Sequence, residues 1–138
     1  MLIHSLPTTP HTRFFQIAYS LALNSPGVGG KKKNNFRLGS LIINRQNHIL
    51  SARFNLNKTH PLLSKYFKFP YLHAEAYCIL SLGFDNCKNH TLYVARIHRN
   101  NHIAMARPCK ECLNLCKFVK IKTIYYTTET GYEKINLC

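Results

Sequence analysis

The chain has 138 residues, of which 46% are hydrophobic, and it carries 19 lysines and arginines against 5 aspartates and glutamates. Its length predicts one domain, residues 1–138, with enough core to fold without disulfide bonds, and this composition argues against a disordered chain. The formal net charge of +14 indicates an anionic partner, either nucleotide phosphate or nucleic acid.

The chain is predicted to begin with a helix. Residues 1–11 contain several prolines and threonines and are expected to be a loose lead-in. Apolar residues recur at helical spacing over 13–24, and Pro26 and a glycine end that segment. A loop rich in glycine and lysine follows over 27–35. Its basic run, Lys31–Lys33, is typical of a solvated surface, so it adds little to the case for nucleic acid.

The middle of the chain is predicted to form a hairpin and a second helix. Two β-rich runs at 36–43 and 48–54 flank polar turn residues, which predicts antiparallel strands. A loop at 55–61 leads to a helix that starts near His73, runs to residue 82 and is stopped by a glycine.

The last third alternates strands with a helix. Strands are predicted at 91–97 and 121–126, with a helix at 109–119 between them. Residues 132–136 can return as a final strand. The connection before it is so short that this strand must be antiparallel, because a parallel one needs a crossover of about a dozen residues. A hairpin followed by alternating helices and strands predicts an α/β fold with a mixed sheet.

A histidine and a glutamate lie two residues apart at the start of the second predicted helix. His73 supplies a nitrogen of the kind that zinc binds, and Glu75 supplies a carboxylate beside it. In the first turn of a helix, residues i and i+2 can both lean into one pocket, although in mid-helix they would diverge by about 200°. The pair therefore predicts one metal ligand with an acid next to it.

A Pro-Cys-x-x-Cys motif opens the next predicted helix. Pro108 is favoured at a helix start, where a missing N–H costs nothing. Cys109 and Cys112 fall on one face of the first turn, where the helix dipole favours thiolates. Together with His73 they supply three zinc ligands and leave a position for water, whose pKa zinc lowers toward neutrality. Glu75 is the candidate proton shuttle.

Each motif also has a plainer interpretation. A C-x-x-C pair alone is often redox-active or structural. An H-x-E pair occurs by chance in many helices. Their combination is more specific, because it matches the H-x-E…P-C-x-x-C signature of zinc nucleobase deaminases.

On these motifs the chain resembles the cytidine/deoxycytidylate deaminase superfamily, and more narrowly the small deaminase-like proteins of bacteriophages. The resemblance covers about residues 13–135 and includes the Asn…Lys-Thr-His-Pro segment at 55–61. It implies a three-layer α-β-α fold with a five-stranded mixed sheet, an antiparallel first hairpin and an antiparallel last strand. It also implies a Zn²⁺ cofactor held by His73, Cys109 and Cys112.

The same resemblance implies residues that bind substrate. Ala74 would offer a backbone contact to the base carbonyl, and Asn55, in preference to Asn57, would contact the sugar. Pro108 would stand at the pocket entrance, where the sequence Ala-Arg-Pro departs from the commoner Glu-Pro or Ser-Pro. An asparagine in a turn often only satisfies backbone groups, so the role of Asn55 has a structural alternative. The candidates for phosphate contact are Arg53, Lys58 and Arg107.

The function implied is hydrolytic deamination of a cytosine nucleotide or nucleoside, with deoxycytidylate first, giving the uracil product and ammonia. The antiparallel ending resembles the branch that acts on free nucleosides. The net charge favours an alternative, deamination of cytosine or adenine in single-stranded DNA, RNA or tRNA. A third interpretation is a non-catalytic zinc-binding protein, which would gain if Cys116 or His60 filled the fourth ligand position. The family often assembles, so a homo-oligomer is expected.

The other cysteines and the tyrosines are given structural roles or none. Cys78 and Cys116 are expected in the core, and Cys87 and Cys138 are assigned nothing. Two thiolate ligands favour a reducing compartment. No run approaches the roughly 18–20 apolar residues of a membrane span, so a cytoplasmic protein without membrane contact is expected. Four tyrosines are expected to pack rather than to stack on a base: Tyr71, Tyr93, Tyr125 and Tyr126.

Overall fold

A computed structural model of the chain describes residues 10–27, 37–56, 60–61 and 72–137. The predictions for residues 1–9, the Lys31–Lys33 loop, Asn57, Lys58, Tyr71 and Cys138 lie outside these residues. In the part of the chain that is described, no helix is long and apolar enough to cross a membrane.

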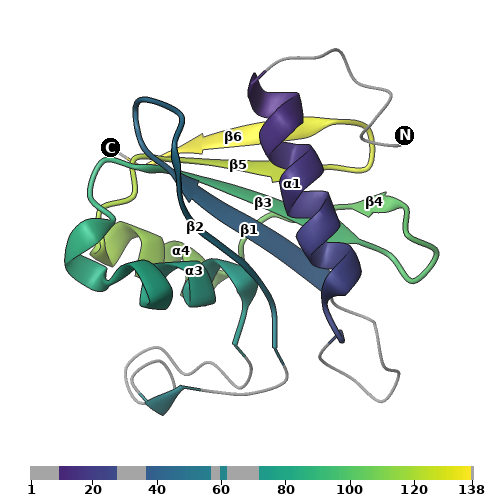
Figure 1. Cartoon of the computed structure of the whole chain (residues 1–138), viewed down its shortest axis with the longest axis horizontal. Coiled ribbons are helices and arrows are strands. Elements are labelled where there is room, and N and C mark those ends of the chain that lie inside the picture. Colours follow the sequence, from purple (N-terminus) through teal and green to yellow (C-terminus); the bar gives the residue numbers. More distant parts are fainter. Residues whose placement is uncertain (1–9, 28–36, 57–59, 62–71, 138) are drawn as a thin grey trace.

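The strands form one mixed sheet in the order β2-β1-β3-β5-β6 (Figure 1). β1 is antiparallel to β2 and to β3, and β3 is parallel to β5. β6 is antiparallel to β5, which confirms both the predicted hairpin and the predicted last strand. The strands are β1 (Arg37–Ile43), β2 (Ile49–Phe54), β3 (Thr91–Ile97), β4 (Ile103–Ala104), β5 (Thr123–Thr127) and β6 (Tyr132–Asn136).

The sheet has six strands, one more than expected, because the short β4 pairs with the end of β3. A tight turn makes this pairing possible. Asn101 in it has a φ of 68°, and the His98 N–H donates to the His102 carbonyl at 2.8 Å. Arg37 fastens the turn to β1, since its Nη2 donates to the Asn101 side chain at 2.7 Å. A strand of two residues is too short to produce a detectable alternation in the sequence.

Helices cover both faces of the sheet, as the three-layer prediction requires. Helix α1 (Pro10–Asn24) packs on one face with a cluster that includes Phe14, Phe15 and Tyr93. Gly39 in β1 allows this helix to approach closely, because a Cβ there would lie 1.9 Å from the Ala18 carbonyl oxygen. Apolar residues of β1 and β3 alternate between this cluster and a second one on the opposite face.

The opposite face carries α3 (Ala74–Leu82) and α4 (Lys110–Phe118), which lie beside each other in Figure 1. Gly83, with a φ of 98°, ends α3 as predicted, and a short 3₁₀ turn follows at Phe84–Asn86. Cys78 and Cys116 are fully buried here, which confirms their place in the core. Cys87 is buried too, a position that its polar neighbours in the sequence do not indicate.

Candidate metal centre

The first ligand candidate stands at the beginning of α3. His73 is the N-cap residue, with extended backbone angles (φ −64°, ψ 151°), and its carbonyl accepts from the Tyr77 N–H at 2.9 Å. Because His73 precedes the first helical residue and Glu75 lies in the first turn, their side chains are not constrained to the divergence of mid-helix positions. Glu75 is buried, whereas His73 is partly exposed.

The other two candidates stand at the beginning of α4. Cys109 is its N-cap residue (φ −67°, ψ 168°), and its Sγ accepts from the Cys112 N–H at 3.5 Å. The buried Pro108 precedes it, as expected for a helix start. The two helices therefore direct their N-termini, with their partial positive charge, toward the same point.

The three side chains come together although 36 residues of sequence separate His73 from Cys109. His73 Nδ1 lies 3.4 Å from Cys112 Sγ and 3.7 Å from Cys109 Sγ. All three ligand atoms lie within 4.8 Å of one another. Tetrahedral zinc with ordinary Zn–N and Zn–S bonds would separate a nitrogen from a sulfur by about 3.6 Å. The cluster therefore fits Zn²⁺ in donor type and in spacing.

The cluster has three members within the described residues, and neither Cys116 nor His60 joins it. A structural zinc site is usually closed by a fourth protein ligand, whereas a catalytic one keeps that position open. The described part of the chain thus offers the ligand set of a catalytic site.

The pKa values of the three ligand candidates are shifted in different directions. Hydrogen bonds from Cys112 and His73 lower the pKa of Cys109 to about 4. Burial and the neighbouring Cys109 raise the pKa of Cys112 well above its ordinary value. Burial lowers the pKa of His73, but the hydrogen bond to Cys109 and the charge of Glu75 outweigh it and the net pKa is raised. Zinc binds both sulfurs as thiolates, so metal binding must displace any proton that the two cysteines still hold.

Glu75 shows the least expected feature of the site. Its side chain is buried, and among the described residues its Oε1 has no hydrogen-bond partner. Burial raises the pKa of this carboxyl above its ordinary value. Burying a carboxylate oxygen without a hydrogen-bond partner costs free energy. In a native site such an oxygen usually takes part in catalysis or binds a partner that is not part of the protein.

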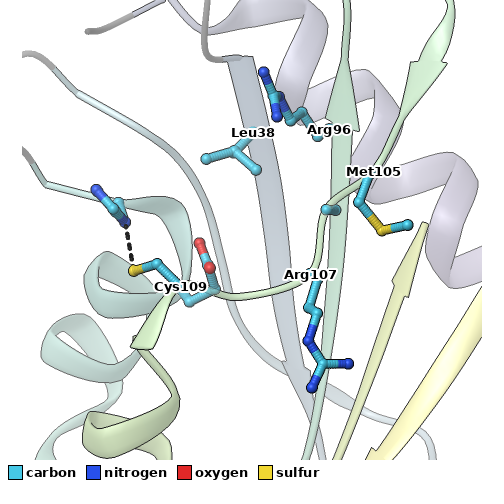
Figure 2. Close-up of a pocket in the computed structure, with 8 residues that line it drawn as sticks. Leu38, Arg96, Met105, Arg107 and Cys109 are labelled. Atoms are coloured by element: carbon cyan, nitrogen blue, oxygen red, sulfur yellow. Dashed lines mark hydrogen bonds between the residues drawn. The ribbon is translucent and has the colours of Figure 1, made fainter. Parts of the chain in front are cut away.

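These side chains open into a pocket with a volume of about 120 Å³. Figure 2 shows Leu38, Arg96 and Met105 around one end of it, and Arg107 extending away from Arg96 at the other. The sequence motifs indicate only part of this wall. The pocket is lined by Leu38, His73, Glu75, Arg96, Met105, Ala106, Arg107 and Cys109.

Three residues with predicted substrate roles do not line this pocket. Ala74 and Pro108 are buried beside it. Asn55 is fully buried, and its Oδ1 accepts from the Leu38 N–H at 2.9 Å and from the Ser25 hydroxyl. This supports the structural role of Asn55, which holds β1 behind the pocket wall. The sugar contact of Asn55, the base-carbonyl contact of Ala74 and the role of Pro108 at the pocket entrance stay predictions.

Two of the phosphate-contact candidates, Arg53 and Arg107, lie in different places, and the third, Lys58, is outside the described residues. Arg107 lines the pocket. Arg53 instead lies 5.3 Å from the ring centre of Tyr77 and lines a second cavity with Leu21 and Phe54. Tyr93 and Tyr126 are buried in the two core clusters, which confirms their packing role.

Residues 8–128 match the family described as the cytidine and deoxycytidylate deaminase zinc-binding region. This match spans most of the chain and both ligand motifs. No curated protein matches the chain significantly, so the expected likeness to phage proteins stays a prediction. The chain belongs to the cytidine and deoxycytidylate deaminase family, and its His-Cys-Cys cluster fits the zinc that this family binds.

Proposed function

We propose that the protein deaminates the cytosine of a free nucleotide or nucleoside by hydrolysis, with deoxycytidylate as the first candidate substrate. The observation that carries this proposal is the buried, unpartnered Oε1 of Glu75 beside a three-ligand metal cluster that opens into a pocket. A structural zinc site needs no such acid.

His73, Cys109 and Cys112 hold the metal, and Glu75 moves the protons. Bound zinc supplies an activated water for attack on C4 of the cytosine ring. The Glu75 carboxylate accepts a proton from that water and passes it to N3, which makes C4 more electrophilic. It then accepts the proton of the hydroxyl group newly formed on C4 and delivers it to the departing amino group, which leaves C4 as a carbonyl. Water and the cytosine base give the uracil base and ammonia, and Glu75 returns to its starting form.

The environment of Glu75 suits it to this work. A group that both accepts and donates protons works best when its pKa lies near the operating pH. Burial shifts the pKa of Glu75 in that direction. The walls of the pocket also exclude bulk water from the carboxylate, which strengthens its interactions with the substrate.

The ending of the chain supports a small free substrate. A short turn joins β5 to the antiparallel β6, an arrangement that resembles the family branch acting on free nucleosides. A second candidate is cytosine or adenine in a single-stranded polynucleotide, which the net charge of +14 favours. The third is a zinc-binding protein without activity.

The test is mass spectrometry of a substrate mixture incubated with the zinc-loaded protein and, separately, with Glu75→Ala. The mixture holds cytidine, deoxycytidine, their mono- and triphosphates, and an oligonucleotide containing cytosine and adenine. Deamination adds about one dalton, because oxygen replaces an amino group. We expect a free nucleotide or nucleoside to shift with the parent protein alone. A shift in the oligonucleotide alone would favour the second candidate, and no shift would favour the third.

A further inference from the structure

One side chain of the pocket is held by a hydrogen-bonded relay that the deamination chemistry does not use. Arg107 Nη1 donates to the Tyr126 hydroxyl at 3.0 Å. That hydroxyl donates in turn to Glu133 Oε2 at 2.7 Å. The relay joins three segments of the chain, since Arg107 precedes the Cys109 motif, Tyr126 lies in β5 and Glu133 lies in β6.

The relay fixes Arg107 without neutralising it. Tyr126 is 2% exposed, its hydroxyl is hydrogen-bonded to both Arg107 and Glu133, and its ring centre lies 5.8 Å from the guanidinium carbon. Glu133 is separated from the guanidinium by the phenol and is exposed to solvent, which screens its charge. Among the described residues, Nη1 is the part of the Arg107 fork with a hydrogen-bonded protein partner. The rest of the fork is available to a ligand.

The charges around the pocket favour an anion at this position. Within the part of the chain that is described, Glu75 supplies the one carboxyl group of the pocket lining. Arg96 and Arg107 are the two arginines of the pocket lining. In Figure 2 Arg96 lies near Leu38, whereas Arg107 lies farther along the segment that leads to Cys109 and is directed away from Arg96. The described lining thus carries two guanidinium groups against one carboxyl group, a balance that favours an anionic substrate.

We infer that Arg107 is a specificity-determining residue that binds the terminal phosphate of a mononucleotide while the base lies at the metal. This inference rests on the proposed function and narrows its substrate class from nucleotide or nucleoside to nucleotide. A guanidinium fork suits a phosphate because it can donate two parallel N–H···O bonds. Tyr126 is a positioning residue, since it acts through Arg107 and is buried in the core.

Equilibrium binding tests this assignment independently of turnover. The zinc-loaded protein carrying Glu75→Gln is titrated calorimetrically with deoxycytidylate, with deoxycytidine and with a short single-stranded oligonucleotide. We expect deoxycytidylate to bind about 10- to 100-fold more tightly than deoxycytidine, as for hydrogen bonds to charged groups. Adding Arg107→Gln should reduce that ratio to near one. Arg53→Gln removes the same charge from a different cavity and should leave the ratio unchanged.

Tyr126→Phe tests the positioning role, because it keeps the packing of the ring and removes the hydroxyl. In the active protein we expect the KM for deoxycytidylate to rise about 2- to 10-fold, the range of one ordinary hydrogen bond. The kcat, and both constants for deoxycytidine, should not change. An equal effect on both substrates would show that Tyr126 serves only stability and would remove it from the assignment.

Four results would overturn the inference. The first is equal binding of deoxycytidylate and deoxycytidine by the protein with Arg107 intact, and the second is a ratio of these two affinities that Arg107→Gln leaves unchanged. The third is no binding of either compound. The fourth is tighter binding of the oligonucleotide than of deoxycytidylate through Arg107, which would assign the residue to a phosphodiester. The proposed deaminase activity and the proposed phosphate site at Arg107 can also be refuted independently of each other. Equal kcat/KM values for deoxycytidine and deoxycytidylate would keep the deaminase and remove the phosphate site. Arg107-dependent binding of deoxycytidylate by a protein that does not deaminate it would keep the phosphate site and remove the deaminase.

Discussion

The two faces of the sheet are built from the same strands but carry different kinds of core. The face under α1 is packed with aromatic and aliphatic side chains such as Phe14, Phe15 and Tyr93. The face under α3 and α4 contains buried cysteines and, at one end, the ligand cluster. The first face is stabilised mainly by side-chain packing, whereas the second would also gain stability from zinc bound at the cluster. Substitutions on the two faces should therefore have different effects on stability, zinc content and activity.

Loss of a ligand should have the largest effect. Cys109→Ser removes one of three zinc ligands, so we expect loss of bound zinc, loss of activity and a lower melting temperature. Metal analysis of the purified protein, together with thermal unfolding before and after chelation, checks this. Cys87→Ser is the matched control, because Cys87 is buried on the same face but lies outside the ligand cluster. It should keep its zinc. Full zinc content in Cys109→Ser would mean that the ligands are wrongly assigned.

Loss of the proton shuttle should affect activity without affecting the metal. In Glu75→Gln the side chain keeps its size, and we expect kcat to fall by about 10²- to 10⁴-fold, the contribution of general acid–base catalysis. Zinc content should be unchanged. Stability should hold or rise, because a buried carboxylate is replaced by a neutral group. Activity close to that of the parent would refute the role of Glu75.

A change under α1 should affect stability alone. Gly39→Ala places a Cβ 1.9 Å from the Ala18 carbonyl oxygen, so α1 must move away from β1. Overpacking of this kind costs about 1–3 kcal/mol or more. Denaturant unfolding measures the loss, and the zinc content of the folded fraction should match that of the parent. If zinc were lost in proportion to stability, the two faces would not be independent.

The smallest expected effect is a pH dependence that belongs to the α1 face. Burial, and then the charge of Lys134, lower the pKa of His11, whose ring contacts Tyr93 and Tyr125. Because the unfolded chain binds a proton more readily, this contribution to stability is present above the unfolded pKa of about 6.5 and is lost as the pH falls through that range. The melting temperature of His11→Asn should therefore depend less on pH between about 5 and 7 than that of the parent. Parallel curves would show that His11 does not titrate with folding.

The same contrast explains what the sequence could predict. His73, Glu75, Cys109 and Cys112 sit at helix starts, where local spacing alone decides which side chains share a face. The helices and the antiparallel ends of the sheet follow from periodicity and connection length. These features depend on residues close together in the sequence, so they could be predicted without the fold.

The rest of the pocket wall depends on distant contacts. Arg96 and Met105 reach the site because the turn at Asn101 folds β4 back on β3, and Arg37 holds that turn. The relay from Arg107 to Glu133 likewise needs β5 and β6 to be paired. Cys87 is buried by the 3₁₀ turn that follows Gly83, although its sequence neighbours are polar. No local pattern carries this information.

The most direct test of the metal-bearing face is deamination of deoxycytidylate in water enriched with heavy oxygen. If Glu75 and the zinc cluster deliver water to the ring, the zinc-loaded protein will place the heavy label in the uracil product. The chelated protein will not form that product, and Glu75→Gln will form it about 10²- to 10⁴-fold more slowly. Product without the label, or equal product from Glu75→Gln, would contradict hydrolysis at this site.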